Sequence, residues 1–286
     1  MVPVAFFVYN RPQHTQRVMD ALKRNNIPLL YVFSDGPKDA ADALKVEETR
    51  NLIDRIDWVE KIVAKEKINK GLANSVAAGV SRVIDEHNEI IALEDDCVPS
   101  ADFYSYMCQC LKRYENEEKV FCVSAYLHPV KSSIFKGYPY DVFFWKRFWS
   151  WGWGTWRRAW EKYEPDTEKL MNAVAAKGIN LKKFGKDILS TVQARKDNTI
   201  DSWAVNWFLT MIAHGALSVY PVRTCINNIG FDGSGIHCGI SGKYDTRFTD
   251  ILKNAKLVFP PDINEDKKIT TATVNFINMP SMRNAL

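Results

Sequence analysis

The sequence predicts an α/β fold in which a mostly parallel sheet is covered by helices on both faces, a three-layer arrangement. In the first 115 residues, short apolar runs alternate with longer segments whose apolar residues recur at helical spacing. This alternation favours βαβ units with parallel strands. Polar residues also follow or adjoin the ends of several apolar runs. The carboxyl ends of parallel strands meet at one edge of the sheet, where such proteins bind ligands.

Four apolar runs are predicted to be strands, and they cover residues 2–9, 28–34, 61–65 and 89–93. Helices are expected between them, over residues 13–25, 39–56 and 71–86. In the third of these helices, Val76, Val80 and Val83 belong to an apolar stripe at helical spacing. The first half of the chain therefore supplies a regular sheet.

The second half is less regular. We expect a helix over residues 101–114, a strand over 120–126, helices over 181–195 and 201–214, and a strand over 217–222. Residues 127–165 are rich in aromatics and glycines but have no clear period, and residues 227–239 form a glycine-rich loop. The tail beyond residue 260 shows little periodicity, so we expect it to wrap around the protein or to fray.

Composition narrows the class of protein. The chain has 286 residues, 46% of them apolar and 25% charged, which is typical of a globular protein. A net charge of +4 gives no reason to expect a nucleic-acid partner, although it suits an anionic substrate or a membrane face. The apolar start lacks a basic segment and a cleavage site, so it is predicted to be a strand rather than a signal peptide.

Membrane contact is expected to be peripheral, because no apolar stretch reaches the roughly 20 residues that a spanning helix needs. The six cysteines lack the spacing of metal fingers. Free thiols in a reducing cytoplasm are therefore expected.

The acidic triplet Glu94-Asp95-Asp96 follows the apolar run 89–93. Carboxylates at the tip of a buried strand repel one another and lose hydration, so a positive charge is expected beside them. Mn²⁺ or Mg²⁺ bridging a diphosphate would supply it, because these cations prefer oxygen ligands and share phosphates with the substrate. A solvated turn that leads into a helix cap is the alternative interpretation.

Two further polar residues follow predicted strands. Arg11 could reach a base or a phosphate, and Asp35 could accept a hydrogen bond from a base, but both also fit ordinary turn and helix-start chemistry. No Gly-x-Gly-x-x-Gly follows the first strand, and no Walker-type phosphate loop is present. Phosphates would then be neutralised by a metal at the triplet.

In this order the segments resemble the donor half of a GT-A-fold glycosyltransferase. The run 90–96 with its Glu-Asp-Asp end, followed by Val98-Pro99 and Asp102-Phe103-Tyr104, is most similar to the N-acetylglucosaminyltransferase I group and related bacterial family 2-like sugar transferases. The resemblance continues through residues 121–125, a Gly-Trp-Gly segment, an Asp-x-Trp segment and a Ser-Gly-x-His loop. It covers roughly residues 3 to 240.

The resemblance assigns donor residues position by position. Asp96 would bind the metal, Mn²⁺ or Mg²⁺, through one carboxylate. Asp95 would face the ribose and Glu94 the donor sugar. Arg11 and Asp35 would hold a uracil, which implies a UDP-sugar donor.

Two other positions near the donor are less defined. Asn74 stands where that family carries a histidine near the nucleotide, so its role stays open. His237 lies in the glycine-rich loop, which would close over the donor and exclude water. This histidine is expected to contact the pyrophosphate or to act as a second metal ligand.

The acceptor half contains an aromatic segment, residues 143–156, with five of the nine tryptophans. Sugar rings stack on aromatic faces, and glycines let the backbone approach a substrate closely. Trp153, between two glycines, and the neighbouring Trp151 are the candidates for contact with the acceptor; packing in the core is the alternative for each. The adjacent basic residues could attract a pyrophosphate or anionic lipid heads.

Asp201 is the candidate catalytic base. Transfer with inversion needs one carboxylate to remove the proton of the attacking hydroxyl, and the resemblance places that base in the segment Thr199-Ile200-Asp201-Ser202-Trp203. Asp201 also stands at the start of the predicted helix 201–214, where an N-cap is the structural alternative. The two roles are compatible.

The sequence therefore predicts a single GT-A domain, with a nucleotide-sugar half over about residues 1–115, an acceptor half over about 116–260 and a tail over 261–286. Its expected activity is that of a metal-dependent, inverting hexosyl- or N-acetylhexosaminyltransferase. It would move a sugar from a UDP-sugar to a carbohydrate hydroxyl in surface polysaccharide or glycolipid synthesis.

The resemblance implies a cytoplasmic protein at the inner membrane face, with a lipid-linked acceptor. A sugar-nucleotide nucleotidyltransferase and a non-catalytic carbohydrate-binding protein are the alternatives. The donor sugar, the linkage and the oligomeric state have no signature in the sequence.

Overall fold

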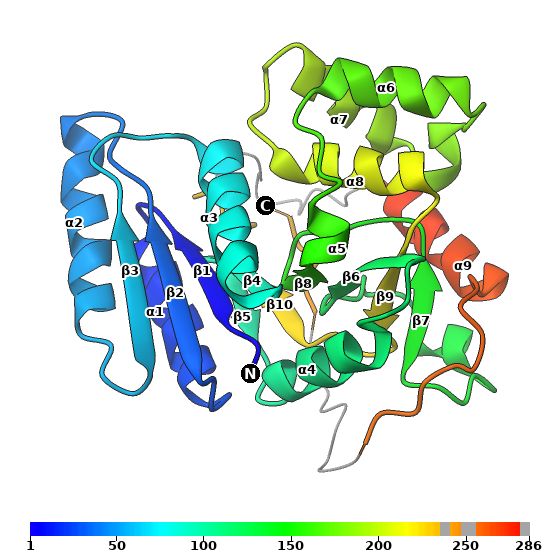
Figure 1. The fold of residues 1–286 in the computed structure, drawn as a ribbon, viewed down its shortest axis with the longest axis horizontal. Helices are drawn as coiled ribbons and strands as arrows, with labels where there is room; N and C mark the ends of the chain where they lie inside the picture. The colour runs from blue at the N-terminus through cyan, green and yellow to red at the C-terminus, as the bar shows by residue number, and fades with distance from the viewer. Residues whose placement is uncertain (235–240, 247–255, 281–286) are drawn as a thin grey trace.

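The computed structural model describes residues 1–234, 241–246 and 256–280. Within them, one eight-stranded mixed sheet has helices on both faces (Figure 1). The strand order is β3-β2-β1-β4-β8-β6-β9-β7. Four of the neighbouring pairs are parallel and three are antiparallel. The predicted α/β class, with a mostly parallel sheet between helical layers, is confirmed.

The strands of the large sheet are β1 (Val4–Val8), β2 (Leu29–Ser34), β3 (Glu60–Lys65), β4 (Glu89–Glu94), β6 (Val120–Ser124), β7 (Val142–Trp145), β8 (Trp153–Trp156) and β9 (Leu217–Pro221). A separate pair consists of β5 (Cys97–Pro99) and β10 (Ile226–Asn228). The α-helices are α1 (Pro12–Lys23), α2 (Ala40–Asp54), α3 (Leu72–His87), α4 (Phe103–Tyr114), α5 (Arg157–Trp160), α6 (Thr167–Ala176), α7 (Asp187–Lys196), α8 (Trp203–His214) and α9 (Lys267–Asn278). Two short 3₁₀ turns are η1 (Ser132–Phe135) and η2 (Leu181–Phe184).

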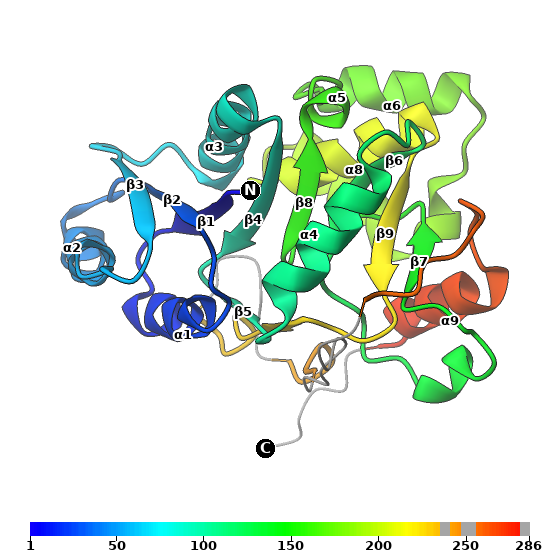
Figure 2. The same cartoon turned by 60° about the horizontal axis from the view of Figure 1, so that its bottom comes forward.

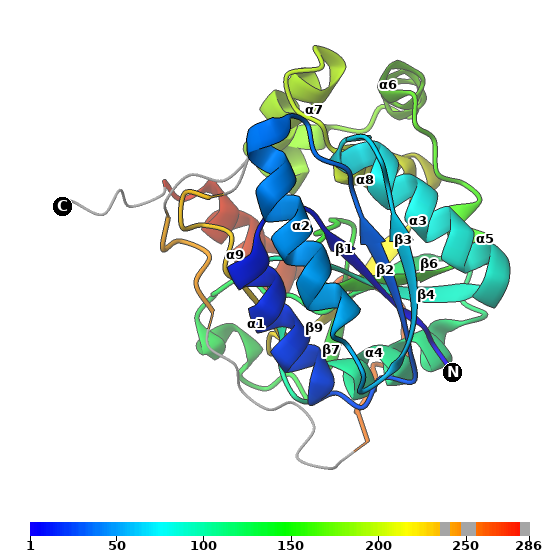
Figure 3. The ribbon, with the colours of Figure 1, turned by 90° about the vertical axis from the view of Figure 1, so that its left-hand side faces the viewer.

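Two cores lie on opposite faces of the sheet. Helices α1, α2 and α4 cover one face and contribute to one apolar cluster. Helices α3, α6, α7 and α8 contribute to the cluster on the other face. Figure 3, seen from the side of β3, shows α1 and α2 on one side of the strands and α3 on the other. Apolar side chains on successive residues of a strand can therefore all be buried, as in β1.

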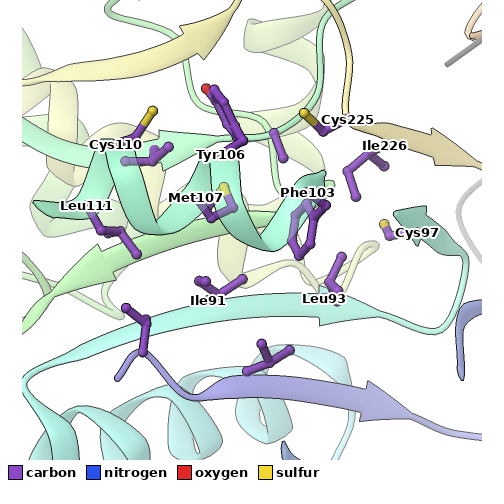
Figure 4. Packing of buried hydrophobic residues seen from close by; sticks show 14 of the residues in the cluster. Ile91, Leu93, Cys97, Phe103, Tyr106, Met107, Cys110, Leu111, Cys225 and Ile226 are labelled. Atoms are coloured by element: carbon purple, nitrogen blue, oxygen red, sulfur yellow. The ribbon is translucent and has the colours of Figure 1, made fainter. Parts of the chain in front are cut away.

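Helix α4 shows how one such face is packed. Its buried side chains Phe103, Met107 and Leu111 recur at a spacing of four and face Ile91 and Leu93 of β4 (Figure 4). Burying a side chain of this size stabilises the fold by about 1.5–3 kcal/mol. The helix thereby fixes the end of β4, which is where the acidic triplet begins.

The region expected to be irregular, residues 127–165, contains two strands of the sheet, so that prediction was wrong. Strand β8 enters antiparallel between β4 and β6. Strand β7 pairs antiparallel with β9 at the edge of the sheet. Each strand has four residues, and all of them are buried, so neither gives the alternation by which a half-buried strand is recognised.

In the tail, the expected lack of periodicity was wrong, because α9 is a regular helix. Its buried residues Ile269, Thr273 and Ile277 recur at a spacing of four. Ile269 and Ile277 pack with Phe143 and Trp145 of β7 in a third apolar cluster. The Asp266 side chain caps the helix by accepting a hydrogen bond from the Ile269 N–H.

Strands β1, β2, β4, β6 and β9 run in the same direction, so their carboxyl ends lie at one edge of the sheet (Figure 2). Arg11, Asp35 and the acidic triplet all follow strands that end at this edge. None of the helices in the described part of the chain is both long enough and apolar enough to span a membrane.

The packing of α9 predicts a stability effect in the tail. Ile269→Ala should lower the free energy of unfolding by about 2–5 kcal/mol, because it leaves a cavity under the helix. Lys267→Ala, an exposed position in the same helix, should change it by less than about 0.5 kcal/mol. Urea unfolding followed by circular dichroism would measure both. Equal stability of the two variants would mean that the tail does not pack as described.

Candidate active site

The acidic triplet lies in a tight turn between two strands. Glu94 is the last residue of β4, and Asp95 and Asp96 form the turn that leads into β5. The Asp95 side chain is 5% exposed and the Asp96 side chain 14%. Three neighbouring carboxyl groups are therefore largely removed from water at the ligand-binding edge of the sheet.

Arg11 is the cation that faces this turn. Its Nη2 donates to Asp95 Oδ1 and, at 3.0 Å, to Asp96 Oδ2. The Tyr9 N–H also donates to Asp95 Oδ2, at 3.4 Å. The loop after β1 thus reaches across to the end of β4, its parallel neighbour in the sheet. The sequence suggested that Arg11 would reach a base or a phosphate, whereas here its guanidinium is bound to carboxylates.

One guanidinium does not compensate the whole cluster. Burial, together with the neighbouring Asp96 and Asp95, raises the pKa of Glu94 to about 8. Burial also raises the pKa of Asp95, to about 6, although Arg11 pulls it down. For Arg11, burial lowers the pKa, but the two aspartates more than reverse this and raise it above its ordinary value. The site can therefore accept further positive charge.

Asp96 is enclosed by the start of β5, the end of β10 and the residues that follow β10. Its Oδ1 lies 3.4 Å from Asn228 Nδ2 and 3.3 Å from the Cys97 thiol, and its backbone carbonyl accepts from the Ile229 N–H at 2.8 Å. A Cβ atom at Gly230 would lie 2.4 Å from Asp96 Oδ2. The absence of a side chain at position 230 therefore lets the backbone lie close to this oxygen, which also accepts from Arg11.

The residues present fit a hard divalent cation with few protein ligands. Among the residues that the structure describes, no three His, Cys, Asp or Glu side chains are grouped so as to hold a metal by themselves. Mg²⁺-type sites commonly use one or two carboxylates and take their other ligands from substrate phosphates and water. Two neighbouring aspartates in a cluster short of positive charge suit that arrangement.

Asp35 holds a loop together. Its Oδ1 accepts from the N–H groups of Gly36 and Lys70, and its Oδ2 accepts from Asn69 Nδ2 and the Gly71 N–H, at 2.8–3.1 Å. A carboxylate has about four acceptor positions, so all are in use. The structure therefore gives Asp35 a positioning role and leaves no free acceptor for the base contact suggested by the sequence.

Asp201 caps a helix other than its own. Helix α8 begins at Trp203 with Ser202 as its N-cap, so the predicted N-cap role within that helix was wrong. Instead, Asp201 Oδ2 accepts from the Ala73 N–H in the first turn of α3, at 3.2 Å. The only charged contact of Asp201 within the described residues is Arg195 Nη1, 3.7 Å from Oδ1. The side chain is 43% exposed, so a substrate can reach it.

The close approach of Asp201 to α3 depends on Gly71. This residue has a φ of +82°, and a Cβ atom there would lie 2.6 Å from Asp201 Oδ2. Asp35 binds the N–H of the same glycine. The end of β2, the start of α3 and Asp201 are therefore joined through residues 69–71.

Trp153 is a core residue and leaves no face for a sugar, which corrects its predicted contact with the acceptor. It is 1% exposed, its ring stacks on Trp203 at 4.8 Å between centroids, and Phe148 packs edge-on at 5.4 Å. The Trp203 side chain also donates a hydrogen bond to Glu94. This tryptophan pair links the end of β4 to the segment that carries Asp201.

Trp151, in contrast, is half-buried and lines a cleft of about 360 Å³. Trp149, Phe231 and Tyr244 also line it, and their ring centroids lie 5.3–5.6 Å from that of Trp151. Phe231 in the wall of this cleft directly follows Gly230, whose backbone lies close to Asp96 Oδ2. The aromatic cleft therefore adjoins the acidic triplet.

The other predicted donor residues are placed as follows. Asn74 is exposed in the first turn of α3, and its amide donates to the Lys70 carbonyl at 3.0 Å. His237 lies outside the described residues. Asn228 and Gly230 fall within the predicted glycine-rich loop, but neither was assigned a role of its own, because their contact with Asp96 joins distant parts of the chain.

Comparison with known proteins identifies similar structures but no family. No family model and no curated protein matches the sequence. The structure is similar to the mannosyltransferase PcManGT from Pyrobaculum calidifontis in complex with GDP-Man and Mn²⁺, with 11% identity and a TM-score of 0.44 over 75% of this chain and 68% of that one. It is also similar to TarS 1-349 from S. aureus, with 11% identity and a TM-score of 0.43 over 79% and 59%. HddC from Yersinia pseudotuberculosis gives 8% and 0.37 over 58% and 81%.

The chain thus spans about 59% of TarS 1-349. At these identities and TM-scores the similarities decide nothing about activity, so the function has to be argued from the site itself.

The raised pKa values predict how protons and a cation compete. Glu94 has a folded-state pKa of about 8, above its ordinary 4.5, and Asp95 of about 6, above 3.8. The folded state then holds more protons than the unfolded one, so stability without metal should fall as pH rises from about 4.5 to 8. Mn²⁺ should raise Tm more at the upper end of that range than at the lower end, because fewer protons then compete with the cation for the carboxylates.

Thermal unfolding with and without Mn²⁺ across this pH range would test the prediction. Glu94→Gln is the matched control, since it keeps the side-chain size, removes the group that titrates highest and should flatten the dependence. A Tm shift with Mn²⁺ that is independent of pH in the unaltered protein would contradict it.

The contact between Gly71 and Asp201 predicts a local clash. Gly71→Ala should destabilise the protein by about 1–3 kcal/mol, from its positive φ and from displacement of the carboxylate. Gly178→Ala is the matched control, because Gly178 has a φ of +64° and nothing within 4 Å of an added Cβ. Urea unfolding of both variants would isolate the clash, and equal losses would show that Asp201 is not held against α3.

Proposed function

We propose that this protein is a metal-dependent glycosyltransferase of the GT-A type that transfers a sugar, with inversion, from a UDP-sugar to a hydroxyl of a carbohydrate acceptor. The observation that carries the proposal is a buried acidic triplet at the ligand-binding edge of the sheet, compensated by one guanidinium and adjoining a tryptophan-lined cleft. A diphosphate with its cation suits the first feature, and a sugar ring suits the second.

The donor would bind at the triplet. Asp96 would hold Mn²⁺ or Mg²⁺, and the bound cation would offset the charge that develops on the departing diphosphate. Asp95 would face the ribose and Glu94 the donor sugar. Arg11 stands beside both aspartates, where it can turn to a phosphate oxygen.

Other parts of the donor site would be supported from a distance. Asp35 would act by fixing residues 69–71 rather than by touching the base. Asn74, exposed on the first turn of α3, would lie at the rim of the nucleotide site. The assignment of His237 as a pyrophosphate contact or second metal ligand stays a prediction.

The acceptor would lie in the aromatic cleft, with a sugar ring against Trp151. Asp201 would take the proton of the attacking hydroxyl as its oxygen bonds to the anomeric carbon, while the bond from that carbon to the diphosphate oxygen breaks on the opposite side. The position of Asp201 against the first turn of α3 supports this role, because the hydrogen bond from the Ala73 N–H holds the carboxylate in place.

We further propose a setting in surface polysaccharide or glycolipid synthesis, in the cytoplasm at the inner membrane face, with the acceptor carried on a lipid. A single GT-A domain over residues 1–286 would serve this activity. Both halves of the chain supply strands to one sheet, which supports that organisation.

Substitution of the two aspartates separates binding from chemistry. Asp96→Asn should abolish the Tm increase that UDP gives in the presence of Mn²⁺, because it removes the metal ligand. Asp201→Asn should keep that increase while kcat with a UDP-sugar and a saccharide acceptor falls by about 10²-fold or more. Thermal shift with UDP, GDP, CDP and dTDP, with and without Mn²⁺, would measure binding and identify which nucleobase the protein recognises.

Asp197→Asn is a control for the chemistry, since this carboxylate lies on the surface near Asp201 and bonds only to Gln193 among the described side chains. It should bind and turn over as the unaltered protein does. Normal turnover by both Asp96→Asn and Asp201→Asn would refute the site assignment. Release of pyrophosphate from UTP and a sugar phosphate would instead indicate a nucleotidyltransferase.

A further inference from the structure

A basic and apolar surface patch lies beside the aromatic cleft and takes no part in the proposed chemistry. It consists of Lys182 and Lys183 of η2, Lys186 just before α7, Leu189 of α7 and Met279 at the end of α9, and is called the lysine rim below. The three lysines are exposed, Leu189 is 40% exposed and Met279 is 58% exposed. The patch thus combines three positive charges with two exposed apolar side chains.

Contacts between distant parts of the chain bring the lysine rim together. The Lys186 N–H donates to Asn278 Oδ1 at 2.8 Å, which places the end of α9 at the start of α7. Lys243 Nζ donates to the carbonyl of Met279 at 2.6 Å and so fixes that residue. Leu189 comes three residues after Lys186, on the same side of the helix. In Figure 1, α7 and α9 lie at the end of the molecule away from α1 and α2.

The charge of the rim has no close partner in the described part of the chain. None of its three lysines forms an ion pair with a described residue. The acidic residue nearest in sequence, Asp187, is bound by the buried Arg147, with Nη2 2.5 Å from Oδ2. The whole chain has a net charge of only +4, so three lysines within five residues hold much of that excess.

This composition matches an anionic lipid surface. Lysines near such a surface attract its phosphates, and exposed apolar side chains reach the boundary between headgroups and acyl chains. A nucleic acid would use the lysines but would give no partner to Leu189 and Met279. Each of the three lysines would raise the affinity for the anionic surface by a factor of about five. Because this attraction is electrostatic and modest in total, the attachment would be reversible and sensitive to salt.

We propose that the lysine rim is a docking surface for an anionic lipid bilayer. The same part of α7 carries Ile188, Thr191 and Val192, which line the aromatic cleft. Docking would therefore bring the mouth of the cleft to the membrane. Binding to lipid requires nothing of the proposed function; only the consequence, access to a lipid-linked acceptor, rests on it.

Co-sedimentation with vesicles tests the proposal. The full chain should bind vesicles of phosphatidylcholine mixed with phosphatidylglycerol, bind far less to phosphatidylcholine alone, and be released by salt. The triple variant Lys182→Glu, Lys183→Glu, Lys186→Glu should bind at least about 100-fold more weakly. Leu189→Ser should weaken binding several-fold and leave its salt dependence in place.

The matched control is Lys23→Glu, Lys45→Glu, Lys119→Glu, which makes the same change of net charge at exposed positions elsewhere on the surface. It should bind vesicles nearly as well as the unaltered chain, and both triple variants should retain the unaltered Tm. Equal losses in the two triple variants would show that net charge alone governs binding and would overturn the proposal. So would binding to single-stranded RNA together with failure to bind either kind of vesicle.

Asp96→Asn separates this proposal from the proposed function. That variant should bind vesicles as the unaltered chain does, whether or not UDP binding proves to need the metal. Vesicle binding without any nucleotide response would refute the transferase assignment and leave the docking surface intact.

Discussion

The burial of three adjacent carboxyl groups against a single guanidinium is the constraint on which this site depends. A buried charge left without its partner costs a protein about 3–5 kcal/mol, so the triplet at the end of β4 requires Arg11. Even with Arg11 in place, burial and mutual repulsion raise the pKa values of Glu94 and Asp95. A fold built for stability alone would gain from apolar residues at these positions. Their presence makes sense where a cation completes the balance of charge.

The rest of the edge is arranged to keep this turn and its surroundings in place. The Asp35 carboxylate accepts hydrogen bonds from the segment before α3. Gly71 in that segment has no side chain, which allows the carboxylate of Asp201 to lie close to it. Beneath Glu94, the stacked pair Trp153 and Trp203 ties β8 to the start of α8. Rigid elements on both faces of the sheet thus hold a carboxylate from each half of the chain. Such support is what a reaction between two bound substrates needs.

The sequence was sufficient for the first half of the fold, because βαβ units combine two strong periodic signals. It also placed Arg11, Asp35 and the acidic triplet at the edge where the parallel strands end. It was insufficient where the signal was short or the contact distant. Strand β8 has four residues and gains its place from pairing with β4 and β6. The cap that Asp201 provides joins residues 128 positions apart, which no local pattern encodes. In α9 the spacing of Ile269, Thr273 and Ile277 was present but overlooked.

The tryptophans illustrate why residue type alone did not separate core from cleft. Trp151 and Trp153 are two positions apart and would share one side of the sheet on an extended chain. Gly152 between them has a φ of +66°, and the two side chains pack with clusters on opposite faces. Their surroundings differ because β8 begins at Trp153, which α8 covers, whereas Trp151 precedes the strand and extends past the sheet to the loop that carries Phe231. One tryptophan therefore stiffens the wall behind the triplet while the other faces the cleft. On the proposed function, this division lets the edge present an aromatic surface to a sugar without loosening the turn that would grip the diphosphate.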